Sequence, residues 1–475
     1  MRKNQCSRHR DYGRGKRIRE GRGAQNAKEG NVTDAETKRT SEPPEKTSDL
    51  STLALLSLFA GAAVGLVGAA FRFSLERADH LRAALINWAY TAKSVGFVLV
   101  MAICASAAGI AAWLVRRYSP QASGSGIPHV EAVLAGELRR APYRLVPVKF
   151  VSGVLAIGSG LALGREGPSV QMGASVAYLF GEIFQRNEND CKMLLGAGAG
   201  AGLAAAFNAP IAGAVFVLEE LVRRFDMRFT IATLGASAGA IAVARVFLGQ
   251  APDFHVETIP FTGFGTVPVH LVLGLIAGCI GAVYSRAILS TLAVSDRLHR
   301  LPAEQRAALI GAIVGLLAWF APGVVGGGDA ITQVTLSGTA AARLVSVMFL
   351  VRFGLGPLSY AAGTPGGLFA PILVLGSQSG FLFGKMFHEW LPAMGANPTS
   401  LGIVGMAAFF TAVVGAPVTG IILVIEMTGS FTLLLPMLSA CFAAMLVTSL
   451  LRSAPIYDSL RERRARLTVA AVYDR

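Results

Sequence analysis

Charged residues are scarce in this sequence of 475 residues. Asp, Glu, Lys and Arg together make up 15% of it, whereas hydrophobic residues make up 53%. Soluble domains carry about 25% charged residues, so the composition excludes an ordinary soluble protein. A stretch of about 20 apolar residues is enough to cross the hydrocarbon core of a bilayer. We therefore expect an all-α protein that passes through a membrane several times.

Cysteines are also few, and none has the spacing of a metal ligand. Cys6, Cys104, Cys191, Cys279 and Cys441 are scattered, with no CxxC pair among them. Such isolated cysteines usually act as small buried residues, and we expect this of all but Cys6. The sequence therefore predicts no metal site, and we expect no cofactor.

The first 50 residues contain few large apolar side chains and cannot form a core. They hold 13 Lys and Arg against 8 Asp and Glu. This composition is typical of disorder, and the excess of positive charge favours the cytoplasmic side of a membrane. No short apolar run follows the basic start, so we do not expect a cleavable signal peptide. We interpret the segment as a solvated tail rather than a nucleic-acid-binding arm.

Apolar stretches of helix length recur through the rest of the chain. Gly and Pro interrupt many of them, which favours short or discontinuous helices. Spans are predicted at roughly Leu53–Phe71, Val95–Val115, Val146–Leu163, Phe229–Phe247, Leu271–Leu289, Ala308–Phe320, Val345–Ala361, Leu401–Val414 and Leu433–Leu451.

One segment, Gly164-Arg165-Glu166-Gly167-Pro168, places two charges between apolar stretches. A charge at membrane depth costs about 2.5–3.5 kcal/mol on insertion scales, so the pair indicates an internal polar path. At a helix N-terminus an ionised Glu166 competes with an anion, and a protonated one can swing away. The residue can therefore couple a proton to anion movement. The alternative is a structural ion pair between Glu166 and Arg165.

Two further segments carry polar groups where a ligand site is possible. Gly124-Ser125-Gly126 leaves a hydroxyl and backbone N–H groups free before a predicted helix, either for an anion or as an ordinary capped loop. Lys149 follows in an apolar run. The helix pair Ala197–Leu221 ends in Glu219-Glu220, and Glu220 is either a second proton station or a solvated charge at the end of a span.

The second half of the chain repeats the first. Pro168 recurs 203 positions later as Pro371, and Glu219 recurs 207 positions later as Glu426. Paired units with broken helices are typical of transporters that bind their substrate at the repeat interface. We predict a tail at 1–50, a first repeat at 51–250, a connection at 251–268, a second repeat at 269–457 and a short tail at 458–475, with both termini cytoplasmic.

Four motifs follow one another in order: GSGIP at Gly124–Pro128, GREGP at Gly164–Pro168, GGLFAP at Gly366–Pro371 and a tyrosine in Pro455-Ile456-Tyr457. With these motifs the sequence resembles the CLC family of chloride channels and proton/chloride exchangers, in its bacterial exchanger branch. The resemblance implies inverted-topology repeats with broken and re-entrant helices. It also implies a homodimer, surrounded by membrane lipid, in a bacterial cytoplasmic (inner) membrane.

The resemblance also assigns roles to single residues. It implies that Ser125 and Tyr457 bind chloride through their hydroxyls, and Leu368 and Phe369 through their backbone N–H groups. Glu166 resembles the external gating glutamate. Glu220 falls on the internal proton-transfer glutamate, a position that channel members fill with a non-titratable side chain. The supporting turn residues are Gly124, Gly126, Arg165, Gly167 and Gly367.

The implied function is a secondary active exchange of chloride for protons. The alternatives are a passive CLC-type chloride channel, or an exchanger for another anion such as nitrate. Ser125 favours chloride, because members of the family that prefer nitrate tend to carry Pro at this position. His129 departs from the family pattern, which commonly has Glu there, and we expect it on a helix surface.

An intramembrane hydrolase is the rival from another class. Ser125 lacks the GxSG context of rhomboid-like proteases, and no neighbouring span offers an evident catalytic histidine. We therefore do not expect an enzyme.

Overall fold

The computed structural model describes residues 50–256, 264–298, 300–390 and 397–473. The predictions for Cys6 and for the basic tail lie outside these residues, and the proposed domain boundaries stay predictions. Within the described residues the fold consists of helices, and the only pairing of extended backbone there is two isolated bridges.

The helices of the first half are α1 (Leu50–Thr91), α2 (Lys93–Tyr118), α3 (Ile127–Leu134), α4 (Leu145–Gly158), α5 (Glu166–Ile183), α6 (Glu188–Phe207), α7 (Pro210–Phe216) and α8 (Met227–Leu248). Between α7 and α8 a π-helical turn, η2, covers Val217–Leu221. A 3-10 turn, η1, covers Pro120–Ala122.

The helices of the second half are α9 (Val267–Arg297), α10 (Ala303–Phe320), α11 (Asp329–Leu336), α12 (Ala342–Tyr360), α13 (Phe369–Trp390), α14 (Pro398–Val414), α15 (Pro417–Thr428), α16 (Leu434–Leu450) and α17 (Ile456–Tyr473). Short 3-10 turns are η3 (Phe264–Thr266), η4 (Pro322–Val324) and η6 (Phe431–Leu433).

Seven helices in the described part of the chain are long and apolar enough to cross a membrane, and α4, α14 and α15 are shorter apolar helices. Each predicted span overlaps a helix. The first was predicted too short, because α1 continues past Phe71 for another five turns, where Arg72 and Glu76 form an ion pair one turn apart. The third was predicted too long, since α4 ends at Gly158 and Gly160 turns the chain with a φ of +102°.

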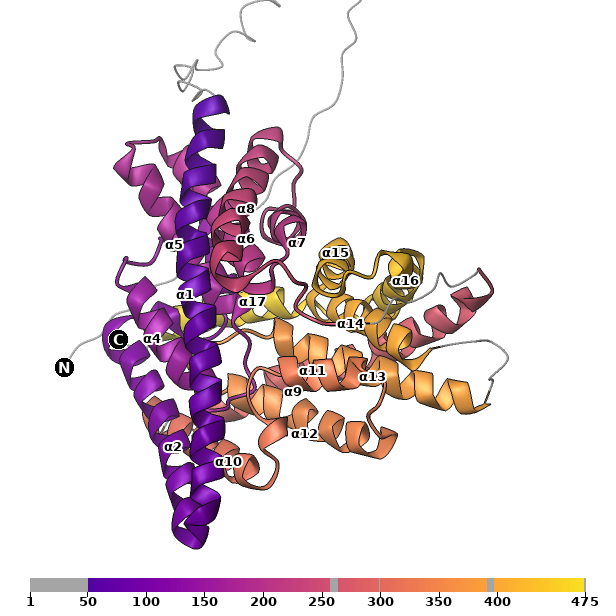
Figure 1. Ribbon diagram of the computed structural model, residues 1–475. Helices are drawn as coiled ribbons and strands as arrows, with labels where there is room; N and C mark the ends of the chain where they lie inside the picture. The colour runs from indigo at the N-terminus through magenta and orange to yellow at the C-terminus, as the bar shows by residue number, and fades with distance from the viewer. Residues whose placement is uncertain (1–49, 257–263, 299, 391–396, 474–475) are drawn as a thin grey trace, which may run out of the picture. The chain divides into compact units, whose positions relative to one another are not determined.

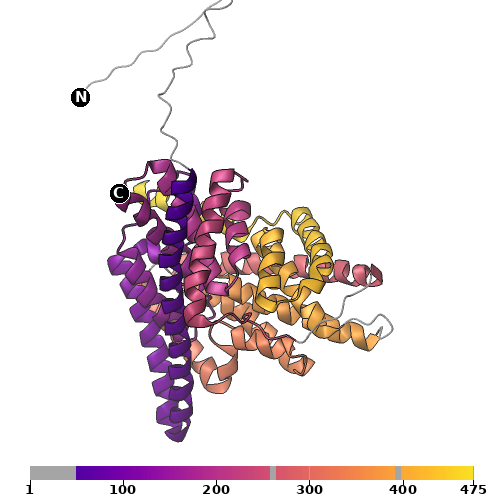
Figure 2. The ribbon, with the colours of Figure 1, turned by 45° about the horizontal axis from the view of Figure 1, so that its top comes forward.

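The two halves pack in the same way, which confirms the predicted internal repeat. In the first half α5 packs on α6 and α1 on α8; in the second half α13 packs on α14 and α9 on α16. Small residues allow the close approach, because a Cβ added to Gly202 on α6 would collide with the backbone of Ser169 on α5. Figure 1 shows the indigo-to-magenta helices of the first half beside the orange and yellow helices of the second half, and Figure 2 shows the same grouping.

The halves meet through elements that correspond to each other, as an approximate two-fold axis requires. Helix α2 contacts its counterpart α10, and α7 contacts α15. Gly164 and Gly367, which are 203 positions apart, form an antiparallel bridge and exchange two backbone hydrogen bonds of 2.9 and 2.7 Å. Helix α17 then returns to the first half and packs on α3.

Two carboxylates join the halves reciprocally at the axis. Glu219 accepts hydrogen bonds from backbone N–H groups at the start of α15, the shorter being 2.6 Å from Thr419. Glu426 does the same at the start of α7, at 2.8 Å from the N–H of Ala212. Each carboxylate therefore caps a helix of the other half, where it satisfies unpaired N–H groups and the positive end of the helix dipole.

The cysteines follow the prediction with one exception. Cys104, Cys191 and Cys441 are buried, but Cys279 is exposed. The prediction was wrong for Cys279 because it lies on the outward face of the membrane-spanning α9, where the surroundings are also apolar and burial inside the protein is not needed.

Candidate functional site

Three glycine-rich turns meet between the halves, directly before α3, α5 and α13. The N–H of Gly124 donates to the carbonyl of Thr364 at 3.1 Å, and the N–H of Gly366 donates to the carbonyl of Gly124 at 3.3 Å. The bridge between Gly164 and Gly367 connects the other two turns. The positive ends of these helices therefore face one place, which favours an anion.

The side chain of Glu166 occupies this place. It is fully buried, and its Oε1 accepts hydrogen bonds from the N–H of Phe369 at 2.6 Å and of Ala370 at 3.4 Å. Its Oε2 has no partner among the described residues. The carboxylate therefore binds the N-terminus of α13, and with it the Phe369 N–H that was predicted to bind chloride.

Arg165 points elsewhere, so the alternative of an ion pair with Glu166 is wrong. Its guanidinium lies 2.6 Å from Asp329 and 3.0 Å from Asp253, and it donates to the carbonyl of Ala206 at 2.8 Å. The cause is the sequence adjacency, since neighbouring residues on a helix project in different directions. Arg165 ties the start of α5 to α6, to α11 and to the segment before α9.

Ser125 and Tyr457 bring two hydroxyls to the same region. Both residues are fully buried, and neither hydroxyl has a hydrogen-bond partner among the described residues. An unsatisfied buried hydroxyl costs about 1–3 kcal/mol, so the pair is suited to a ligand. The ring of Tyr457 lies 5.7 Å from that of Phe369, and a Cβ on Gly167 would lie against the Ser125 hydroxyl.

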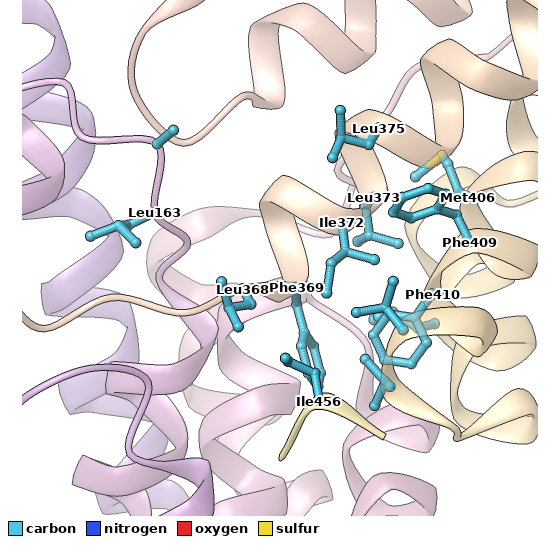
Figure 3. Close-up of a cluster of buried hydrophobic side chains, with 14 of the residues drawn as sticks. Leu163, Leu368, Phe369, Ile372, Leu373, Leu375, Met406, Phe409, Phe410 and Ile456 are labelled. Atoms are coloured by element: carbon cyan, nitrogen blue, oxygen red, sulfur yellow. The ribbon is translucent and has the colours of Figure 1, made fainter. Parts of the chain in front are cut away.

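An apolar cluster surrounds the start of α13. Leu368 and Phe369 are fully buried, and the Phe369 ring lies 4.7 Å from that of Phe410 and 5.6 Å from that of Phe216. Figure 3 shows Phe369 directed toward Phe410 and Ile456, with Leu368 beside it. This packing fixes the backbone whose N–H groups face the site and keeps bulk water away from them.

Lys149 supports the serine turn from behind, a role that the sequence did not reveal. Its fully buried ammonium donates to the carbonyls of Gly124 and Ser125 at 3.0 and 3.1 Å, and to Gln171 at 2.5 Å. The lysine therefore orients the turn through its carbonyl groups. Its ammonium is not directed toward the Ser125 hydroxyl, where the anion is expected. The hydroxyl of Tyr360 adds a contact of 3.4 Å with the N–H of Ser125.

The second half contains an equivalent support 203 positions later. Arg352 is buried and donates to the carbonyls of Gly326 and Gly327 at 2.6 and 2.9 Å, in the turn before α11. Both turns end in a left-handed glycine, Gly126 with φ +89° and Gly328 with φ +106°. The recurrence of a cation at this offset is the signal in the sequence that could have identified Lys149.

Glu220 lies away from the turns, on η2. Its side chain is 4% exposed, its Oε1 has no partner among the described residues, and its Oε2 lies 3.8 Å from Arg223. It lines an open pocket of about 380 Å³ together with Glu219, Arg223 and Pro455. A carboxylic acid that is buried yet borders an open pocket can take up or release a proton there.

A second pocket of about 310 Å³ leads to Ser125. Its lining includes Ser125, Leu460, Arg306, Arg463 and Arg464. Because arginines predominate among its charged groups, the pocket attracts anions. The two pockets share no lining residue, and the segment at the start of α17 contributes to both, with Pro455 in one and Leu460 in the other.

His129 is 5% exposed, so the prediction of a surface histidine is wrong. Helix α3 is covered by α5, α6 and α17, and the local sequence could not show that these helices enclose it. The ring borders a small pocket with Gln171 and Tyr178. His129 is therefore part of the packing behind the serine turn.

Comparison with known proteins gives consistent similarities. A family model described as voltage gated chloride channel matches residues 107–449. The H(+)/Cl(-) exchange transporter ClcA of Vibrio cholerae serotype O1 (strain M66-2) is 36% identical over 416 residues, covering 86% of this chain and 88% of the relative. A slow cyanobacterial Cl-/H+ antiporter superposes with a TM-score of 0.83 at 30% identity, covering 87% of this chain and 97% of that chain. A eukaryotic CLC transporter, at 21% identity and a TM-score of 0.74 over 86% of this chain and 74% of that chain, shares the fold.

Proposed function

Because the chain belongs to the voltage gated chloride channel family, we propose that it is a secondary active antiporter that exchanges chloride for protons. The observation that carries the proposal is the position of Glu166. Its carboxylate accepts the N–H of Phe369 at 2.6 Å, in the place that the helix N-termini prepare for an anion. Carboxylate and chloride therefore compete for the same donors.

Protonation of Glu166 links the two ions. The neutral acid is a weaker acceptor than the carboxylate, so it leaves the N–H of Phe369 free for chloride. The N–H of Leu368 and the hydroxyls of Ser125 and Tyr457 then supply the remaining donors. When the proton leaves, the carboxylate returns and displaces the anion. Hydroxyls and helix dipoles bind chloride without a full countercharge, which permits its release.

Glu220 supplies the second proton station. It borders its own open pocket, whereas the arginine-lined pocket leads to Ser125. Protons and chloride therefore share the region of Glu166 but reach it by separate routes. Protons pass through the pocket at Glu220, and chloride passes through the pocket at Ser125. Tyr457, at the start of α17, lies in the chain between Pro455, which lines the pocket at Glu220, and Leu460, which lines the pocket at Ser125.

The test is the simultaneous recording of proton and chloride fluxes from purified protein in liposomes. An imposed chloride gradient is expected to drive protons uphill, in a fixed ratio to chloride. Chloride flux without proton movement would instead identify a passive channel, and no flux would exclude transport.

Chloride is the proposed anion because the hydroxyl of Ser125 faces the site. In an anion-competition assay, wild-type protein is expected to prefer chloride to nitrate, and Ser125→Pro is expected to reverse or flatten this preference. Tightly coupled nitrate exchange by the wild type, faster than that of chloride, would contradict the assignment.

The protein is further proposed to work as a homodimer in a bacterial inner membrane, with both termini in the cytoplasm. The outer faces of α7 and α15 support the dimer, because Ile211 and Val418 are 54% and 49% exposed beside the carboxylates of Glu219 and Glu426. A carboxylate at membrane depth raises the free energy of the protein when it lies next to lipid. A second copy of the chain that covers the outer faces of α7 and α15 would remove this contact with lipid. Native mass spectrometry should give twice the chain mass of 49.6 kDa, and a monomer would contradict it.

A further inference from the structure

A cluster of charged residues surrounds Glu220 and has no role in the exchange steps above. The Nη2 of Arg223 lies 2.8 Å from Asp458, 3.8 Å from Glu220 and 3.8 Å from Glu131. One guanidinium therefore faces three carboxylates, which come from α17, η2 and α3. The side chains of Glu131 and Glu220 are 3% and 4% exposed, whereas that of Arg223 is 47% exposed.

The backbone of Arg223 is specialised for this position. Its φ is +54°, in the left-handed region that residues other than Gly and Asn seldom adopt. Its Nε also donates to the carbonyl of Glu220 at 3.2 Å. This conformation turns the guanidinium back toward η2, and the surrounding ion pairs compensate for the backbone strain.

The other groups around Glu220 are mostly acidic. Glu131 contacts Arg461 at 2.8 Å through one oxygen, and its other oxygen has no partner among the described residues. Glu219 is directed toward α15, and Asp458 toward Arg223. Among the charged groups around Glu220, which come from α3, α17, η2 and the turn that follows η2, Arg223 in that turn is therefore the one whose positive charge favours release of the proton.

The position of Asp458 extends this cluster to the anion site. It follows Tyr457 in the chain, so the first turn of α17 carries both a predicted chloride ligand and the partner of Arg223. Arg223 and Glu220 also line the same open pocket of about 380 Å³. The ion pair thus connects the helix that bears Tyr457 with the mouth of the proton route.

We propose that Arg223 is a positioning residue for proton transfer, which holds the carboxylate of Glu220 at the open pocket, and that Asp458 holds Arg223 in place. The inference rests on the proposed function, because it assigns a role within the proton half of the exchange. Without the guanidinium, Glu220 faces only carboxylates, and its side chain is free to turn away from the pocket. Proton transport then slows while the chloride donors stay intact.

The experiment compares Arg223→Gln with Arg224→Gln in liposomes. Arg224 is the next residue, is exposed and carries the same charge, so its variant is a matched control for the change in net charge. For Arg223→Gln we expect proton flux to fall about fivefold with chloride flux changed less than about twofold. The pH of half-maximal proton flux should also rise, because proton release from Glu220 becomes less favourable. An Arg223→Gln protein that matches Arg224→Gln in both fluxes and in pH profile would overturn the proposal.

Asp458→Asn supplies an independent test, since it leaves Arg223 in the chain. It should lower proton flux in the same direction by a smaller factor, and the double variant should be no worse than Arg223→Gln alone. Fully additive losses would contradict the proposed link between the two residues. The retained chloride flux reports that each variant is folded. A wild-type protein without coupled flux would overturn the proposed function and this inference with it, whereas a coupled wild type with an unaffected Arg223→Gln variant overturns the inference alone.

Discussion

The two halves of this protein have the same arrangement of helices but carry different functional side chains at corresponding positions. Helix α5 begins with Glu166, and its counterpart α13 begins with Phe369, 203 positions later. The turn before α3 carries Ser125, whereas the turn before α11 has Gly327 between its glycines. The difference teaches that the repeat supplies the convergent helix ends, while a few residues in one copy supply the hydroxyl and the titratable group.

The largest effect is expected from removing the asymmetry at the start of α5. Glu166→Ala leaves both copies without an acid at this position, and nothing then competes with chloride at the N–H of Phe369. Proton flux should fall by about 100-fold or more, in the range of other positioned proton-transfer groups, while chloride flux continues. Paired flux recordings measure this. A variant that still exchanges the two ions in a fixed ratio would show that Glu166 is not the gate.

The two buried cations should differ in effect although their positions correspond. Lys149→Met leaves the carbonyls of Gly124 and Ser125 without a donor, at about 1–3 kcal/mol, and displaces the serine turn. We expect chloride affinity, measured by titration calorimetry, to fall by about tenfold. Arg352→Met should destabilise the protein without this loss of affinity. Equal losses of affinity in the two variants would contradict the functional difference between the copies.

The reciprocal caps should behave alike, because both do the same structural task. Glu219→Gln and Glu426→Gln each weaken one helix cap, a change typically worth about 1 kcal/mol. Because the shift in melting temperature per kcal/mol shrinks as the chain grows, we expect the apparent melting temperature in detergent to fall by about 1 °C for each variant. A clear difference between the two shifts would show that the approximate symmetry does not extend to their energetics.

The smallest effect concerns α17, which follows the second half and has no counterpart after α8 in the described chain. A hydrogen bond from Arg461 holds the pKa of Glu137 below its usual value. A lowered pKa stabilises the folded state above the unfolded-state value, and this contribution is lost as pH falls through the lower folded-state value. Acidification should therefore lower the melting temperature through this pair by less than about 1 °C, since the pair is exposed and the chain is long. Glu137→Gln should remove that part of the pH dependence, and an unchanged acid slope would assign it to other groups.

Much of the fold was predictable because apolar runs and recurring Pro and Gly residues are local signals. The spans and the repeat follow from them, but the continuation of α1 beyond Phe71 does not, since its charged residues interrupt the apolar run. The turn motifs likewise predicted Ser125 and Glu166 as neighbours of one site. In the structure these residues lie in turns joined by backbone hydrogen bonds.

The remaining features depend on contacts between distant segments. Arg223 and Asp458 are 235 positions apart and meet only when α17 returns to the first half. The cation at position 149 recurs at position 352 in the sequence, but its contact with two backbone carbonyls is visible only in the folded chain. His129 was misplaced for the same reason, because its cover comes from helices that a single segment cannot reveal. Tertiary pairing, rather than local propensity, decides these positions.

The bridge between Gly164 and Gly367 has a consequence for the history of the chain. An antiparallel contact on a two-fold axis joins a residue to its own equivalent, so two separate copies of a half-length chain would make the same pair of hydrogen bonds. The same holds for the reciprocal caps of Glu219 and Glu426. A half-length ancestor that paired with an upside-down copy of itself would already have these contacts, and gene duplication followed by fusion would preserve them while freeing one copy to acquire Glu166.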